Sequence, residues 1–204
     1  MKFTKSHLLS IVLGIVIVLP YLGVGSIYLW NKRKTEIIEN ACFVVISKQK
    51  LTLSVYDYKG DEKCTFPIAC GKNWGDKNQV GDMKTPEGVF HVSEIQNAEN
   101  WSHDFKDEKG EIAGAYGPFF IRLDVPSHSG IGIHGTHDNN SLGTRATEGC
   151  IRLQNENVLK LVELIHAGTT VVITPSVDDI VVKEDVKKEE NQKKEIQQNN
   201  YGQK

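Results

Sequence analysis

Cysteine is scarce in this sequence, and an excess of basic charge is absent. The 204 residues include four cysteines, at positions 42, 64, 70 and 150, which are too few and too scattered for a disulfide framework. We therefore expect Cys42, Cys64 and Cys70 to be buried free thiols. The formal net charge is −2, and no cluster of Lys and Arg is interleaved with aromatic residues. This charge pattern predicts no nucleic-acid partner.

Charged residues are also missing from Leu8–Leu29, a run with basic residues on both sides. About 20 apolar residues span a bilayer core, whereas the apolar region of most signal peptides has about 7–15. Residues 1–34 are therefore predicted to be a membrane anchor with a single transmembrane helix, and residues 35–41 a short connector. A cleaved signal peptide, cut near Gly25, is the alternative. Because both flanks are basic, the positive-inside rule does not give the orientation.

The hydrophobic pattern predicts a mainly β domain over residues 42–176, and a hydrophobic content of 39% is typical of one ordinary globular domain. Apolar residues at spacings of three and four favour one helix over Asn155–His166. We expect a β-sandwich or small barrel of short strands with this helix packed on it. The polar stretch 96–114 has the length of a lid, and residues 177–204 are charged and predicted to be disordered. The predicted strands lie at 43–46, 51–56, 64–69, 89–93, 118–123, 131–134 and 169–174.

The strongest candidate for a catalytic site is the segment Ser129–Leu153. A short apolar alternation ends in His134, a polar loop follows, and Cys150 stands between a glycine and an apolar residue. A free thiol is only a few per cent ionised near neutral pH, so a nucleophilic cysteine needs a base nearby, and an imidazole suits that role. Sixteen positions separate the two residues, enough for a loop to bring them within hydrogen-bond reach. The backbone amides around Gly149 and Cys150 are candidates for an oxyanion hole.

These residues resemble a known catalytic signature. His134-Gly-Thr136, followed by Leu142-Gly143 and Thr147-Glu-Gly-Cys-Ile-Arg152, is similar to the active-site motif of the L,D-transpeptidase catalytic domain, also called the YkuD-type domain. The resemblance extends more weakly over residues 43–174. It implies a β-rich domain with a helix alongside, a cysteine nucleophile, no cofactor and no metal. In that family the carbonyl of the residue after the histidine orients the ring, which corresponds here to Gly135.

Further site residues follow from position and from the resemblance. Arg152 lies two residues after the cysteine, so on an extended segment it projects to the same side, where it can grip a substrate carboxylate. An ion pair with a nearby carboxylate of the protein is the equal alternative for Arg152. Thr147 and His137 complete the candidate substrate-binding set, with Thr147 chiefly supporting the loop. Glu148 replaces the histidine of the family motif, and we expect a cation, Arg152 or Arg145, to hold it away from the thiol.

The resemblance implies acyl transfer on the stem peptides of peptidoglycan. Cys150 attacks the amide after the third residue of a stem tetrapeptide, the terminal D-alanine leaves, and an amine of a second stem accepts the acyl group in a 3→3 cross-link. Water as the acceptor gives an L,D-carboxypeptidase, and a lipoprotein lysine or a free D-amino acid gives other products. Such an enzyme is expected on the outer side of the cell membrane, held by a single span, on the periplasmic or wall side.

Two other classes of function stay open from the residues alone. His134, His137 and Cys150 have donor atoms of the kind that bind zinc in a hydrolase, although no second ligand pair occurs at a common spacing. A wall-binding module whose altered motif has lost activity is the other alternative. Metal analysis and covalent trapping of the cysteine distinguish these from a thiol enzyme.

Overall fold

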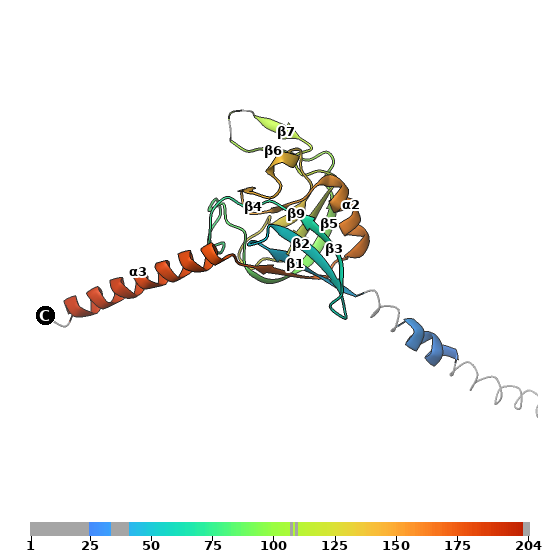
Figure 1. Cartoon of the computed structure of the whole chain (residues 1–204), viewed down its shortest axis with the longest axis horizontal. Helices are drawn as coiled ribbons and strands as arrows, with labels where there is room; N and C mark the ends of the chain where they lie inside the picture. The colour runs from blue at the N-terminus through green and yellow to red at the C-terminus, as the bar shows by residue number, and fades with distance from the viewer. Residues whose placement is uncertain (1–24, 34–40, 107, 109, 202–204) are drawn as a thin grey trace, which may run out of the picture. The chain divides into compact units, whose positions relative to one another are not determined.

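The computed structural model describes residues 25–33, 41–106, 108 and 110–201 (Figure 1). The chain divides into two compact units, residues 1–41 and 42–204. In the first unit residues 25–33 are helical, and most of the predicted membrane span, 8–24, lies outside the described residues. No helix in the described part of the chain is long and apolar enough to cross a membrane.

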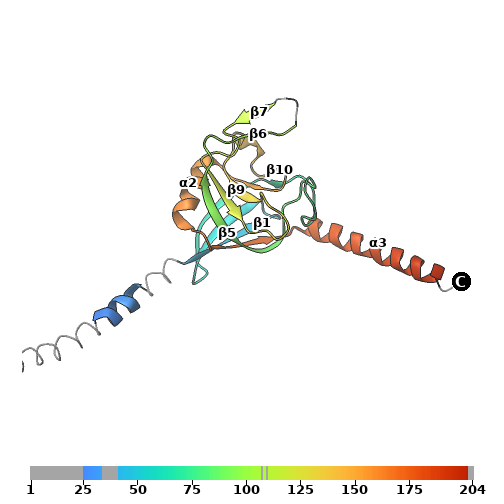
Figure 2. The same ribbon diagram turned by 180° about the vertical axis from the view of Figure 1, so that it is seen from behind.

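The second unit is built on one curled, eight-stranded sheet, seen from two sides in Figures 1 and 2. The strand order across the sheet is β11-β9-β8-β5-β12-β1-β2-β3. Alternating apolar residues form these strands because every second side chain faces the core. Their bounds are β1 Cys42–Ser47, β2 Thr52–Asp57, β3 Glu62–Pro67, β5 Gly88–Asn97, β8 Phe119–Leu123, β9 Gly132–His134, β11 Ile151–Arg152 and β12 Thr170–Thr174.

The predicted sandwich is wrong, because a single sheet curls until its two edges approach each other. Ala69, two residues after β3 ends, forms an antiparallel bridge with Arg152 of β11, the opposite edge strand. Two backbone hydrogen bonds of 2.9 Å join this pair. The curled sheet therefore has the character of the predicted small barrel. It also brings the segment after β3 against the strand that follows Cys150.

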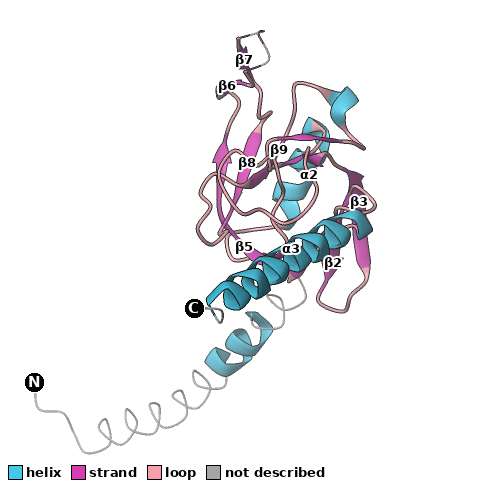
Figure 3. Ribbon diagram, turned by 90° about the vertical axis from the view of Figure 1, so that its left-hand side faces the viewer, coloured by secondary structure: helices cyan, strands magenta, loops and turns pink. Residues whose placement is uncertain are grey.

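Four short strands outside this sheet were not predicted from the sequence. β4 (Cys70–Gly71) pairs in parallel with β10 (Arg145–Thr147). β6 (Ser102–Asp104) and β7 (Glu111–Ala113) form an antiparallel hairpin, which projects from the sheet in Figure 3. This hairpin lies in the polar stretch 96–114, which was predicted to be a lid. Strands of two or three residues carry too little hydrophobic pattern to be recognised.

The core lies between the concave sheet and helix α2 (Asn155–Leu164), which ends two residues earlier than predicted. Val158 and Leu161 of α2 are completely buried, and Ile165 just beyond it is 5% exposed. Burying a side chain of this size contributes about 1.5–3 kcal/mol. The four cysteines are free thiols, as predicted, although Cys42 and Cys64 are only half-buried. Two residues separate β11 from helix α2, so the packing of this helix fixes the end of the strand that follows the candidate nucleophile.

The disorder predicted for residues 177–204 is not what the structure shows over Val177–Tyr201, which form helix α3, and residues 202–204 lie outside the described residues. The domain boundary predicted at residue 176 is also absent, because the compact unit that begins at Cys42 includes α3. Asp179 is completely buried, and its carboxylate accepts hydrogen bonds from the backbone N–H of Gly75 at 2.6 Å and from Ser176. Arg145 donates to the same carboxylate at 2.8 Å. Composition does not predict this anchor, because one buried carboxylate cannot be distinguished from the exposed ones in a charged segment.

A buried lysine joins this anchor to the loop between β4 and β5. Lys48 is 1% exposed, and its ammonium lies 2.8 Å from Glu87 and 3.2 Å from Asp179. It also donates to the carbonyl oxygens of Gly75 and Thr85. A buried charge is tolerated only when it is paired and hydrogen-bonded. Lys48 therefore ties three separate segments of the chain together.

Replacing Lys48 by methionine is expected to lower the free energy of unfolding by about 3–5 kcal/mol, because Glu87 and Asp179 both lose a buried cationic partner, although Arg145 remains on Asp179. Denaturant titration of the full chain measures this change. Lys106→Met is the matched control, since Lys106 is exposed and its ion pair with Asp104 lies in solvent. Equal unfolding midpoints for Lys48→Met and the wild type would show that the buried pairs contribute nothing net.

Candidate active site

The two halves of the sequence motif meet on neighbouring strands. β9 and β11 pair in parallel, with Ile133 opposite Ile151 and His134 opposite Arg152. Cys150 lies immediately before β11, so it is placed beside the start of β9. The loop between the strands leaves the sheet and returns, which is what the 16-residue spacing predicted.

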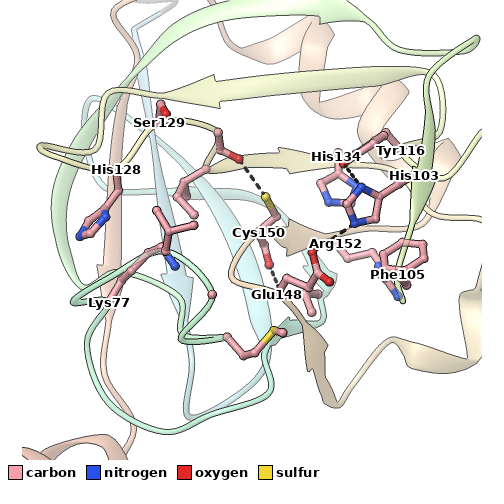
Figure 4. A pocket seen from close by; sticks show the side chains of 16 residues that line it. Lys77, His103, Phe105, Tyr116, His128, Ser129, His134, Glu148, Cys150 and Arg152 are labelled. Carbon is pink, nitrogen blue, oxygen red and sulfur yellow. Dashed lines mark hydrogen bonds and ion pairs between the residues drawn. The ribbon is translucent and has the colours of Figure 1, made fainter. Parts of the chain in front are cut away.

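Cys150 and His134 both line a cavity of 360 Å³. In Figure 4 the cysteine lies between Lys77 and His128 on one side and His134, Tyr116 and His103 on the other. The walls come from the β4–β5 loop, the β6–β7 hairpin, the loop between β7 and β8, the loop into β9 with the end of β9, and the segment from the end of β10 through β11. The lining residues are Lys77, Val80, Gly81, Met83, His103, Phe105, Tyr116, His128, Ser129, Gly130, Ile131, His134, Thr147, Glu148, Cys150 and Arg152.

The imidazole of His134 is held as a neutral base. Its Nδ1 lies 2.6 Å from the carbonyl oxygen of Gly135, and a carbonyl can only accept, so Nδ1 carries the hydrogen and Nε2 has the free lone pair. The ring is stacked on Phe120 at 5.6 Å, and the residue is 4% exposed. Burial lowers the pKa of His134 to about 3, against the opposing hydrogen bond to Gly135. The expected orientation by Gly135 is therefore present.

The thiol of Cys150 rests on a backbone carbonyl. Its Sγ donates to the oxygen of Gly130 at 3.3 Å, and no hydrogen bond joins it to His134 among the described residues. Burial raises the pKa of the Cys150 thiol, and the charge of Glu148 adds to the rise while Lys77 and Arg152 oppose it. Thiol and imidazole are thus both neutral at rest. Proton transfer between them adds no net charge, so it is the way in which a buried pair can ionise.

The turn before the cysteine is fixed by two threonines. Thr147 Oγ1 donates to the carbonyl of Cys150 at 2.6 Å and accepts the N–H of Gly149 at 3.2 Å. Thr85 donates to the carbonyl of Gly149 at 2.9 Å. Thr147 thus supports the loop, as expected. The N–H of Gly149, a predicted oxyanion donor, is already engaged inside the turn.

Glycine is required at both motif positions. Gly149 has φ +136°, and a Cβ there would meet the carbonyl oxygen of Lys84 at 2.8 Å. A Cβ on Gly135 would collide with Asn155 Oδ1 and with the backbone of Gly117. The same Oδ1 accepts the N–H of Thr136 at 2.8 Å. The start of α2 therefore locks the residues that follow His134.

The buried side chain of Arg152 has one hydrogen-bond donor without a partner among the described residues. The residue is 5% exposed, its Nη1 donates to Ser141 at 3.0 Å, and its guanidinium lies 5.6 Å from the ring centre of Phe105. Its buried Nε has no hydrogen-bond partner, and no ion pair of Arg152 occurs in the described part of the chain. A buried donor without a partner is costly, so a ligand carboxylate would satisfy it. The alternative of an ion pair within the protein is not what the structure shows.

The partner of Glu148 is neither of the predicted arginines but a histidine. Glu148 Oε2 lies 3.1 Å from Nε2 of His103, on the β6–β7 hairpin. Arg145 instead pairs with Asp179 and stacks on Trp74 at 3.6 Å. Only the aromatic and polar character of the hairpin segment indicated that it faces the site. The sequence pattern alone could not predict His103 as the partner of Glu148, because 45 positions separate the two residues.

His137 is not among the residues that line the cavity. It is exposed and lies against the ring of Phe105, with 5.4 Å between centres. His134, by contrast, is buried, with one nitrogen committed to Gly135. The described residues contain no group of three or more His, Cys, Asp or Glu arranged to hold a metal ion. The three residues of the zinc alternative are therefore not gathered into one donor set.

Comparison with known proteins agrees with this geometry. The family model described as the L,D-transpeptidase catalytic domain (YkuD) matches residues 41–173. The chain is 31% identical to the YkuD protein of Bacillus licheniformis over 132 residues, which is 65% of each chain. It is 34% identical to YqjB of Bacillus subtilis over 136 residues, 65% of this chain and 70% of that protein. Both relatives carry names that assign them to the L,D-transpeptidases.

A solved structure shares the fold. The Bdellovibrio bacteriovorus protein Bd1075 has a TM-score of 0.50 and 23% identity, over 69% of this chain and 50% of that one. The chain therefore belongs to the L,D-transpeptidase family of enzymes, with the curled, mainly β fold of its catalytic domain and one packed helix. The matched segment covers 65% of the length of the B. licheniformis relative.

The buried, neutral His134 makes a specific pH dependence expected. In the unfolded chain a histidine binds a proton below about pH 6.5, whereas in the folded protein it does so only near pH 3. The free energy of unfolding should therefore fall by about 1.4 kcal/mol per pH unit as the pH drops through this window. Denaturant titrations between pH 6.5 and 4.5 measure it, above the range where Asp179, with its pKa lowered to about 2, contributes.

His134→Gln should remove most of this slope, while His137→Gln, at an exposed position, should leave it intact. The same slope in His134→Gln and the wild type would show that another group binds the proton.

Proposed function

We propose that this protein is an L,D-transpeptidase that acts on peptidoglycan stem tetrapeptides through a thioester on Cys150. The observation that carries the proposal is the cavity in which Cys150, a neutral His134 with its Nε2 free, and an unsatisfied Arg152 converge. Membership of the family supports the substrate class. The nucleophile, its base and an anchor for a substrate carboxylate are the three parts that acyl transfer from a peptide requires.

The first half-reaction begins when the thiol leaves Gly130. Rotation of the Cys150 side chain releases its hydrogen bond to that carbonyl and lets Nε2 of His134 take the proton. The sulfur attacks the carbonyl carbon of the third residue of the stem. Arg152 holds a carboxylate of the peptide. His134 then returns its proton to the nitrogen of the departing D-alanine. The thioester on Cys150 is left.

In the second half-reaction an acceptor replaces the sulfur. The amine of a second stem gives a 3→3 cross-link and restores the free thiol. Water gives a tripeptide instead, which is the L,D-carboxypeptidase activity that stands as the alternative function. Phe105 of the β6–β7 hairpin and Tyr116 of the loop before β8 line the cavity and supply apolar surface for a second peptide.

The substrate is a wall polymer, so we place the enzyme at the cell membrane with its catalytic domain outside the cytoplasm. The uncharged run Leu8–Leu29 supports a single-pass anchor at the N-terminus. The net charge of −2 gives no attraction to nucleic acid, and the proposed partners are stem peptides and the membrane.

Cys150→Ala should abolish the release of D-alanine from purified disaccharide tetrapeptides, measured by chromatography of the muropeptides. Loss of a nucleophile costs several orders of magnitude, so residual activity above about one hundredth excludes a covalent thiol mechanism. A carbapenem should add its own mass to the wild-type chain and nothing to the variant, by mass spectrometry. Cys70→Ala is the matched control, because Cys70 is a buried thiol outside the cavity.

The membrane proposal has its own test. A reporter fused after Lys204 should be active only in an extracytoplasmic assay, and the full chain should resist carbonate extraction. A mature N-terminus near Ser26 would indicate a cleaved signal peptide in place of the anchor. Reporter activity in the cytoplasm would remove the cell-wall function.

A further inference from the structure

The hairpin side of the cavity holds a hydrogen-bonded chain of three side chains that the steps above do not use. Glu148 Oε2 lies 3.1 Å from Nε2 of His103, and Nδ1 of His103 lies 3.1 Å from the hydroxyl of Tyr116 (Figure 4). All three residues line the cavity that contains Cys150. The Tyr116 ring packs edge-on against His134, with 4.9 Å between ring centres. The chain therefore runs from the base that serves the thiol to a carboxylate at the mouth of the cavity.

With Glu148 ionised and His103 neutral, these hydrogen bonds have one arrangement of protons. An ionised carboxylate only accepts, so Nε2 of His103 is the donor to Glu148. In a neutral imidazole the other nitrogen then has the lone pair, and it accepts from the hydroxyl of Tyr116. Burial, with the nearby Cys150 and Glu148, raises the pKa of Tyr116, so its hydroxyl keeps its proton. Tyr116 thus has an oxygen lone pair to offer a proton donor in the cavity.

Aminolysis of the thioester needs a second base. An alkyl amine has a pKa of about 10, so the acceptor arrives as an ammonium and must lose two protons to become an amide nitrogen. His134 can pass one of these protons to the sulfur of Cys150 as the C–S bond breaks. It cannot hold the other at the same time. Water arrives neutral and needs only the one transfer that His134 provides.

We propose that Tyr116, His103 and Glu148 form a proton relay that removes the first proton from the acceptor ammonium; this inference rests on the proposed function. The ammonium proton moves to Tyr116 Oη while the hydroxyl proton of Tyr116 moves to Nδ1 of His103. Glu148 stabilises the resulting imidazolium. The free amine then forms the C–N bond, the thiolate of Cys150 leaves and is protonated through His134, and the relay releases its proton to solvent. A C–N bond replaces the C–S bond, and no atom is oxidised or reduced.

In this relay Tyr116 is the catalytic residue that meets the acceptor, and His103 and Glu148 are positioning residues that act through it. It explains the carboxylate in the motif, because Glu148 is hydrogen-bonded to His103 and its charge would only disfavour the thiolate. It also makes the relay a determinant of the acceptor, favouring an amine over water.

The test compares the two products of one thioester. Full-length wild type, Tyr116→Phe and Glu148→Gln are incubated with disaccharide tetrapeptides, and 3→3 dimers and tripeptides are quantified by liquid chromatography and mass spectrometry. We expect the dimer-to-tripeptide ratio to fall about tenfold or more in both variants, within the range that a positioned base contributes. The rate of carbapenem adduct formation on Cys150, which involves no amine, should stay within about threefold of the wild type in Tyr116→Phe and should not fall in Glu148→Gln, where the charge that raises the pKa of the thiol is removed.

His91→Gln is the matched control, since His91 also pairs with a carboxylate, Asp124, but on the exposed surface of β5 outside the cavity. Thermal unfolding of each variant checks that the fold is kept. An unchanged product ratio in Tyr116→Phe, with normal adduct formation, overturns the relay and leaves the proposed function standing. Loss of adduct formation in Tyr116→Phe assigns the hydroxyl to the thiol step and overturns the acceptor role. A wild type that forms neither adduct nor D-alanine overturns both proposals.

Discussion

The parallel pairing of β9 with β11 is the constraint on which the site depends. Register on a strand is discrete, so placing His134 opposite Arg152 also fixes the position of Cys150, two residues earlier. A slip of one residue would turn the alternating side chains to the other face and separate the base from the thiol. The bridge between Ala69 and Arg152 and the hydrogen bond from Leu153 N to the oxygen of His134, 2.8 Å long, hold this register from both sides.

Buried polar side chains around the site connect the same strands to the rest of the domain. Lys48 reaches Thr85, whose hydroxyl holds the carbonyl of Gly149, so the turn of the nucleophile is connected to the first strand of the sheet. Asp179, at the start of α3, secures the same lysine and Arg145. Such a network is costly when it is incomplete, because each buried charge then lacks its partner. It makes the first turn of α3 part of the catalytic domain.

Burial sets the chemical character of the catalytic pair. His134 is neutral with its lone pair on Nε2, and Cys150 is a neutral thiol that rests on Gly130. Separating charge between them is unfavourable because His134 is buried and Cys150 is only partly exposed.

Sequence alone determined the elements whose information is local. The alternation in Cys42–Ser47 and Thr170–Thr174 marks strands, the spacing in Asn155–Leu164 marks a helix, and the motif around His134 and Cys150 marks the site. Tertiary structure decided what joins distant parts of the chain. Those decisions are the curling of one sheet in place of a sandwich, the partnership of Glu148 with His103 and the burial of Asp179. Local patterns report which face of a segment is apolar, whereas the partner of a buried charge depends on where the whole backbone goes.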